Sequence, residues 1–243
     1  MACARQPRSD RRGAIAGDLT IAGRFNGPLD SGQGGYSAGM LAGFVEGPAA
    51  VSLRRPVPLD TPLAVASSGA GAASLLDGEQ LVAEAVAEPF GVEVPQPVDL
   101  AAAREATTRY RGERDGMFSR CFVCGLARED GFHVHAGEVP GRGLVASPWT
   151  PPDWAADEAG NVRPEFVWAA LDCPATFTAP ALGFLARFAV RIDGPVAAGR
   201  EYVIIGWPLG AEGRKQHAGS AIFTAGGDLV AASRALLVVP RAS

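Results

Sequence analysis

Residues 32–44 read GQGGYSAGMLAGF, and the interpretation of this stretch decides the fold. It contains G-Y-S-A-G, a match to the G-x-S-x-G nucleophile elbow of serine hydrolases. Ser37, Asp172 and His217 also follow one another in the chain order of the α/β-hydrolase triad. An elbow needs a buried β-strand that runs directly into the serine. The residues before Gly35 read NGPLDSGQG, which is a loop sequence, so we interpret Ser37 as a small residue in the first turn of a buried helix.

The same order of elements occurs twice along the chain. A strand-like stretch and a Gly/Pro-containing loop lead into an Ala/Gly-rich run at 35–44, and again into the run EFVWAALDCP at 165–174. Each run is followed by several strand-like stretches and a hairpin, with an Asp-Gly turn at 77–78 and a Gly-Gly turn at 226–227. Neither run has an apolar stripe opposite a charged face, which is typical of a helix buried on most sides. The sequence therefore predicts one buried helix followed by antiparallel strands, twice.

This order resembles the hotdog-fold acyl-CoA thioesterases, and more closely the double-hotdog members, in which two hotdog units are fused. The resemblance rests on QGG entering the first helix, AALDCP in the second and the closing HAGSAIFTAGGDLVAASRA, and it covers residues 18–240. It implies an α+β double hotdog with two antiparallel sheets, each wrapped around a central helix, at about 35–46 and 165–173. The expected parts are a mostly disordered tail at 1–17, an N-terminal hotdog unit with linker at 18–120 and a C-terminal hotdog unit at 121–243.

Asp172 is the strongest single candidate for chemistry. It is the only charged residue between Glu165 and Arg187, and burying a lone carboxylate is costly unless it is paired or its pKa rises. It is predicted to lie near the C-terminal end of its helix, where the helix dipole disfavours a negative charge. Such a carboxylate is a candidate nucleophile or general base. In the alternative interpretation it is structural and bonds the hydroxyls of Thr176 or Thr178.

Gln33, Gly34 and Gly35 open the first helix. Helix N-termini present unpaired N–H groups with partial positive charge, so the N–H groups of both glycines could polarise a thioester carbonyl as an oxyanion hole. The resemblance places Gln33 where His or Asn is commonest in the family, which puts its role in doubt. The alternative is a Gly-rich loop that caps the helix.

Laying one helical run over the other places Asp172 opposite Ala42, and the Gly34-Gly35 pair opposite Pro164-Glu165. The first half therefore has the glycine pair but no aspartate, and the second half has the aspartate but no glycine pair. In hotdog dimers of the phenylacetyl-CoA thioesterase type, the Gly comes from one unit and the Asp from its partner. The resemblance thus implies one composite active site per chain.

The CFVCG sequence at 121–125 is followed by His133 and His135, which gives C-x2-C-x8-H-x-H, a set of four potential zinc ligands. Structural zinc sites usually space the two histidines by three to five residues, so we expect no metal here, although both histidines would share one face of a strand. Cys121 and Cys124 are expected to pack under the C-terminal unit. Four cysteines in 243 residues do not make a disulfide framework; they are Cys3, Cys121, Cys124 and Cys173.

The charge balance limits the kinds of partner that the protein is expected to bind. With 22 Lys and Arg against 26 Asp and Glu, the net charge of −4 argues against a nucleic-acid partner. No apolar run approaches the roughly 18 residues of a membrane span, and the location expected is cytoplasmic. Arg214, Lys215 and His217 could bind the phosphates of coenzyme A, or they form a solvated loop cluster.

The function expected is hydrolysis of an acyl thioester, most simply acyl-CoA, with coenzyme A as part of the substrate and no resident cofactor. One alternative is a hydratase or dehydratase of acyl thioesters on the same fold. These enzymes use an Asp/His pair, and no His lies near Asp172 in the sequence. The other alternative is a protein that binds acyl-CoA without turning it over. The chain could also pair as a homodimer of double-hotdog chains.

Overall fold

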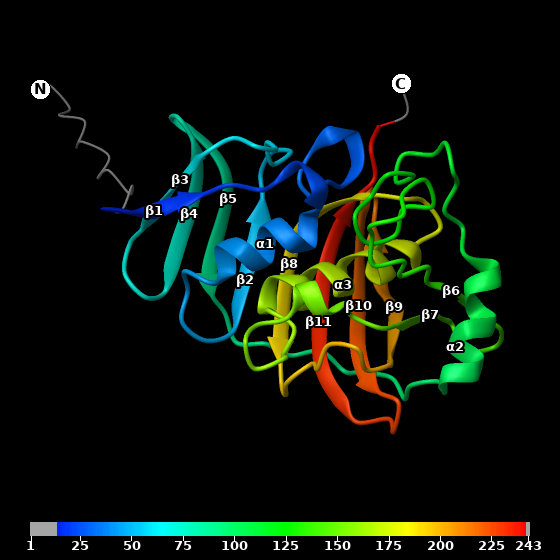
Figure 1. Ribbon diagram of the computed structural model, residues 1–243. Coiled ribbons are helices and arrows are strands. Elements are labelled where there is room, and N and C mark those ends of the chain that lie inside the picture. The colour runs from blue at the N-terminus through cyan, green and yellow to red at the C-terminus, as the bar shows by residue number, and fades with distance from the viewer. Residues whose placement is uncertain (1–13, 242–243) are drawn as a thin grey trace, which may run out of the picture.

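The computed structural model describes residues 14–241 (Figure 1). Its helices are α1 (Gly34–Ala42), α2 (Leu100–Ala106) and α3 (Pro164–Phe177). Its strands are β1 (Ala14–Leu19), β2 (Ala49–Leu53), β3 (Leu63–Ser67), β4 (Ala72–Asp77), β5 (Gln80–Ala87), β6 (Gly137–Val139), β7 (Leu144–Trp149), β8 (Phe184–Ile192), β9 (Tyr202–Glu212), β10 (Lys215–Thr224) and β11 (Leu229–Val238). None of the helices in this part of the chain is both long enough and apolar enough to cross a membrane.

All eleven strands belong to one sheet, in the order β1-β3-β4-β5-β2-β8-β11-β10-β9-β7-β6. The expectation of two separate sheets is therefore wrong. The two halves join where β2 pairs antiparallel with β8, from Ala49 opposite Val190 to Ser52 opposite Arg187. The edge of each half would otherwise leave a row of backbone N–H and C=O groups unpaired, and this pairing satisfies them. The α+β class and the predominance of antiparallel strands agree with the expectation.

The helices α1 and α3 lie side by side on one face of this sheet (Figure 1). α1 packs mainly on β2, β5 and β8, and α3 mainly on β8 to β11. Two glycines of α1, Gly35 and Gly39, allow the close contact between the two helices. A Cβ atom added at Gly35 would lie 2.5 Å from the carbonyl oxygen of Trp168, and one added at Gly39 would lie 2.7 Å from Cα of Glu165. Only glycine allows this closeness.

Both helices differ in length from the expected spans. α1 ends at Ala42 instead of near residue 46, and α3 continues to Phe177. Pro174 lies inside α3. Proline removes one backbone donor and disfavours a helix interior. The twelve buried residues of this helix, from Phe166 to Phe177, pack it firmly enough to continue past the proline.

Both hairpins are confirmed. β4 and β5 are joined by Gly78 and Glu79, one residue later than expected, and Gly78 has a φ of +56°. β10 and β11 are joined through Gly227, with a φ of +90°. The predicted disordered tail is wrong for residues 14–17, because they pair with β3 as part of β1. Residues 1–13, including Cys3, lie outside the described part of the chain.

The linker between the two halves covers part of the outer face of the sheet, over strands of the C-terminal half. Ala103 and Ala106 of α2 are fully buried and pack with alternate residues of β7, β9 and β10, while Phe90 and Val94 pack from the preceding segment. The Asp99 side chain caps α2 by accepting a hydrogen bond from the Ala102 N–H at 2.8 Å. The other face of the sheet, under α1 and α3, holds the larger core and the site described next.

Candidate active site

A cavity of about 330 Å³ lies where the first turn of α1 meets the middle of α3. This volume is at the lower end of the range for small-molecule pockets. Its polar end is formed by Gln33, Gly34 and Asp172, and its apolar wall includes Leu53, Phe177 and Leu185. An apolar cavity with a few converging polar groups is the usual form of a ligand site.

The Asp172 side chain is only 6% exposed, and both of its hydrogen-bond donors come from the start of α1. Its Oδ2 accepts from the Gly35 backbone N–H at 2.9 Å and from Nε2 of Gln33 at 2.6 Å. The carboxylate does not bond a threonine hydroxyl, as the structural alternative required. The Thr176 hydroxyl instead donates to the backbone carbonyl of Asp172 at 3.4 Å.

The electrostatic setting of Asp172 differs from the sequence expectation. Because α3 runs on to Phe177, Asp172 lies in the helix interior, where the dipole of its own helix acts weakly. Its carboxylate faces the N-terminus of α1, whose partial positive charge favours an anion. Burial nevertheless raises the pKa of Asp172 to about 7, against the lowering effect of the Gly35 N–H, with a further increase from Cys121 and a lowering by Gln33. Its carboxyl group can therefore both hold and release a proton near neutral pH.

Gln33 links the helix terminus to the carboxylate. Its Oε1 accepts the Tyr36 N–H at 2.6 Å, which caps α1, while its Nε2 donates to Asp172. The chain at Gln33 is extended, with φ −60° and ψ 129°, as an N-cap residue should be. The side chain is 1% exposed. One amide group thus fixes both the start of α1 and the orientation of Asp172.

The two glycines after Gln33 have different roles. The Gly35 N–H is already bonded to Asp172, so the expectation that both glycines polarise a carbonyl is corrected for Gly35 in this arrangement. Gly34 lines the cavity, and its N–H makes no hydrogen bond to any residue that the structure describes. As the first residue of α1 it has no partner within the helix either. Gly34 therefore offers the free donor at the polar end of the cavity.

The serine-hydrolase triad is not assembled. A short 3₁₀ turn at Pro28–Asp30 precedes α1, so no strand leads into Ser37. The Ser37 side chain is buried and its Oγ has no hydrogen-bond partner in the described chain. His217 is exposed on β10, and Asp172 bonds neither of them.

The cations predicted to bind coenzyme A lie outside the cavity. Arg214, Lys215 and His217 are exposed at and after the turn between β9 and β10, and Arg214 donates to the carbonyl of Val239 at 3.0 Å. Two other arginines, Arg54 and Arg55, do line the cavity. They follow β2 directly, within a segment whose sequence is typical of a strand, so nothing local marks them as site residues.

The two cysteines of the CFVCG segment lie beside Cys173 of α3. Cys121, Cys124 and Cys173 are all buried, and their sulfur atoms lie within 4.8 Å of one another. His133 and His135 do not join them. His133 Nε2 lies 3.0 Å from the carbonyl of Glu129, and the His135 ring stacks on another aromatic ring.

Replacing Gln33 by alanine is expected to lower the free energy of unfolding by about 1–2 kcal/mol, because the α1 cap is lost. It should also reduce any Asp172-dependent turnover by about 10–100-fold, because a hydrogen bond to a charged group contributes about 1.5–3 kcal/mol. Chemical denaturation and turnover measure the two effects. Arg163→Ala is the matched control, since Arg163 is the N-cap residue of α3 but makes no side-chain cap bond. An equal loss in both variants would contradict the role given to Gln33.

The fold and the cavity define a class: α+β proteins in which helices pack on one face of a long antiparallel sheet and a ligand site lies at a helix end. Comparison with solved structures identifies this arrangement as the hotdog fold. A candidate thioesterase II from Thermobifida fusca aligns with a TM-score of 0.60 at 14% identity, over 92% of this chain and 93% of that one. A candidate thioesterase from Novosphingobium aromaticivorans aligns with a TM-score of 0.60 at 12% identity, over 92% and 95%.

A conserved hotdog-fold protein of unknown function from Alicyclobacillus acidocaldarius gives a TM-score of 0.57 at 10% identity, over 93% of both chains. No protein-family model matches this chain, and no curated protein matches it in sequence. At these identities the likenesses establish the fold, and the hotdog architecture expected from the sequence is confirmed.

Proposed function

We propose that this chain hydrolyses acyl thioesters, with acyl-CoA as the expected substrate, at one composite site between α1 and α3. The observation that carries the proposal is the contact between Asp172 and the N-terminus of α1 at the polar end of the cavity. A buried carboxylate whose pKa is raised to about 7, beside a free backbone N–H, provides a proton acceptor and an oxyanion donor together.

The reaction can be followed from these groups. The thioester carbonyl oxygen accepts a hydrogen bond from the Gly34 N–H, which stabilises the negative charge that develops when the carbonyl carbon is attacked. Asp172 either removes a proton from water, so that hydroxide attacks, or attacks directly to form an acyl-carboxylate anhydride that water then hydrolyses. In both routes the carbon–sulfur bond breaks and the thiolate leaves. The apolar wall of the cavity takes the acyl group. Arg54 and Arg55 also line the cavity and bond Glu84 and Gln80 in this structure, and they would bind the phosphates of coenzyme A.

The fused, double-hotdog organisation is part of this proposal, and matching local geometry supports it. Just before α1, the Gln33 N–H donates to the Phe25 carbonyl at 2.8 Å; just before α3, the Arg163 N–H donates to the Ala155 carbonyl at 3.0 Å. Each of these loops begins with a short 3₁₀ turn and is closed by an antiparallel bridge. Both elements of the composite site come from one chain, so no second copy is needed to complete it.

The equivalent position at the start of α3 has neither the backbone donor nor the carboxylate, which supports a single site per chain. Pro164 stands where α1 has Gly34, and proline has no N–H to donate. Ala42 stands where α3 has Asp172. Rings from both halves fill this region, including Tyr36 and Phe166, whose centroids lie 5.3 Å apart.

The alternatives predict other products. A hydratase would add water to an enoyl thioester and leave the thioester intact, and it would need an acid or base partner for Asp172. The donors on this carboxylate are an amide and a backbone N–H, not a histidine, so hydrolysis fits better. A binding protein would hold acyl-CoA without releasing thiol.

A panel of acyl-CoAs separates these functions. We expect release of free coenzyme A, followed with a thiol reagent, for at least one acyl chain that fits the cavity of about 330 Å³. Protein without substrate corrects for its own cysteines. Loss of enoyl absorbance with the thioester intact would instead establish a hydratase, and saturable binding with no thiol release across the panel would establish a binding protein.

A further inference from the structure

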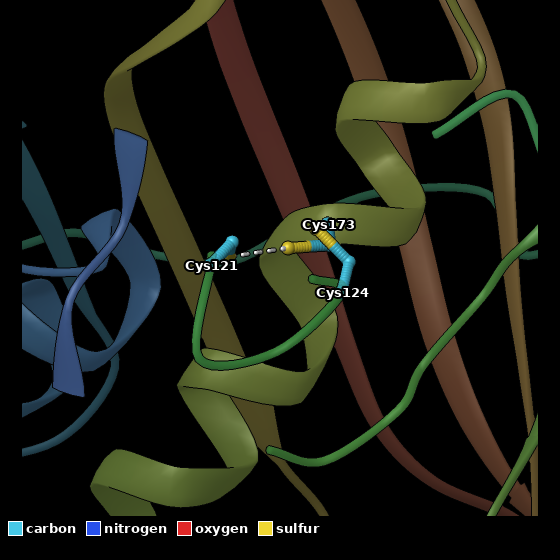
Figure 2. Close-up of side chains that lie close together, drawn as sticks. All are labelled: Cys121, Cys124 and Cys173. Atoms are coloured by element: carbon cyan, nitrogen blue, oxygen red, sulfur yellow. Dashed lines mark hydrogen bonds between the residues drawn. The ribbon is translucent and has the colours of Figure 1, made fainter. Parts of the chain in front are cut away.

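Three cysteine side chains from two distant segments converge on one point, as Figure 2 shows. Cys121 and Cys124 lie on the loop before β6, and Cys173 lies on α3; Cys121 and Cys173 are 52 residues apart in sequence. The sulfur atoms of Cys121 and Cys173 are 3.8 Å apart. All three sulfurs lie within 4.8 Å of one another. Tetrahedral zinc binds thiolates at about 2.3 Å, which puts two ligating sulfurs about 3.8 Å apart. The two sulfurs of a disulfide are instead about 2.05 Å apart.

The loop that carries two of these sulfurs is a tight turn that depends on glycine. The Gly125 N–H donates to the carbonyl of Cys121 at 2.8 Å, and a Cβ atom added at Gly125 would lie only 2.6 Å from that oxygen. A C-x2-C-G turn of this kind holds both sulfurs on one side of the backbone. C-x2-C is also the ligand spacing commonest in structural zinc sites.

All three thiols are buried, and three thiolates this close together in a buried site would repel one another. A bound divalent cation would compensate their charge.

We propose that Cys121, Cys124 and Cys173 bind one zinc ion. Three soft sulfur ligands select zinc or copper(I) over magnesium, calcium or manganese, and the 3.8 Å between the sulfurs of Cys121 and Cys173 fits tetrahedral zinc. Cys121 and Cys173 also line the cavity that holds Asp172, so the fourth coordination position is accessible from that cavity. A zinc site with three protein ligands and one open position is the form in which zinc binds water or a substrate atom.

This inference departs from the sequence expectation of no metal, and the reason is the identity of the third ligand. The C-x2-C-x8-H-x-H interpretation tested only residues near in sequence, and its histidines point elsewhere. Cys173 comes from the helix that carries Asp172, and only the fold brings it to the C-x2-C turn. The inference does not rest on the proposed hydrolysis, because metal binding can be measured without any substrate.

The test uses the full chain carrying Cys3→Ser, so that the only cysteines are the three in question. After expression with zinc and removal of free metal, elemental analysis should find about one zinc per chain. Replacing zinc with cobalt(II) should give an intense near-ultraviolet band from thiolate-to-metal charge transfer. Cys121→Ala and Cys173→Ala should each reduce bound zinc to below about a tenth of an equivalent. His133→Ala is the matched control and should retain the full equivalent.

Two outcomes would overturn the proposal. One is a folded reference protein with reduced thiols that still binds less than about a tenth of an equivalent when incubated with excess zinc. The other is loss of zinc from His133→Ala equal to the loss from the cysteine variants. If the cysteine variants fail to fold, alkylation of the reference protein decides the question. Zinc should slow the reaction of all three thiols with a maleimide, and measurable labelling that proceeds at the same rate with and without zinc would refute the site.

Discussion

Asp172→Asn is expected to reduce thioester hydrolysis by about 10²–10⁴-fold, the usual cost of losing a nucleophile or general base. Asparagine keeps the size of the side chain, and its oxygen can still accept from the Gly35 N–H and Gln33. It cannot take up a proton or attack a carbonyl at a useful rate. The melting temperature should change little, because the variant no longer buries an ionisable group whose pKa is already raised to about 7. Thiol-release kinetics and thermal melting measure both effects.

Ser37→Ala provides the control for that experiment. Ser37 is buried in the same helix, but its Oγ has no hydrogen-bond partner in the described chain and does not line the cavity. Its removal should leave turnover within a few-fold of the parent protein. Full activity in Asp172→Asn would refute the proposed chemistry, and loss of activity in Ser37→Ala alone would restore the serine-hydrolase interpretation. A lower melting temperature with turnover retained in Asp172→Asn would make Asp172 a structural residue.

The features that could be predicted from sequence are those that local composition controls. The Asp-Gly and Gly-Gly turns fix two hairpins because only certain residues accept their backbone angles. Ala/Gly-rich runs without a polar face identify helices buried on most sides. Asp172 was recognisable because an isolated charge in an apolar run must have a partner or a function.

The features that were missed depend on contacts between distant segments. Nothing local in β2 or β8 specifies that their edges pair, so the expected two sheets become one. The continuation of α3 beyond Pro174 depends on how completely its neighbours bury it. Cys173 joins Cys121 only because α3 passes beside the C-x2-C turn. Arg54 and Arg55 line the cavity for the same kind of reason, since their position depends on the path of the chain after β2.

Gly35→Ala is expected to lower the free energy of unfolding by about 2–3 kcal/mol, the upper part of the usual cost of overpacking. The added methyl group would lie 2.5 Å from the backbone carbonyl oxygen of Trp168 and 2.7 Å from Cβ of Asp172. A backbone oxygen inside a buried helix cannot move aside as a flexible side chain can, so α1 and α3 must separate. That separation would lengthen the bond from the Gly35 N–H to Asp172 and should abolish most turnover as well.

Gly43→Ala tests whether this loss is specific to the helix contact. Gly43 has helical backbone angles at the end of α1, φ −60° and ψ −13°, and an added Cβ would meet its nearest neighbour at an ordinary 3.5 Å. Alanine there should be neutral or stabilising by up to about 1 kcal/mol, because it reduces the freedom of the unfolded chain. Thermal melting should therefore separate the two variants by roughly 5–10 °C for a chain of this size. Equal melting temperatures would mean that the two helices can move apart without cost, and α1 could not then hold Asp172 in place.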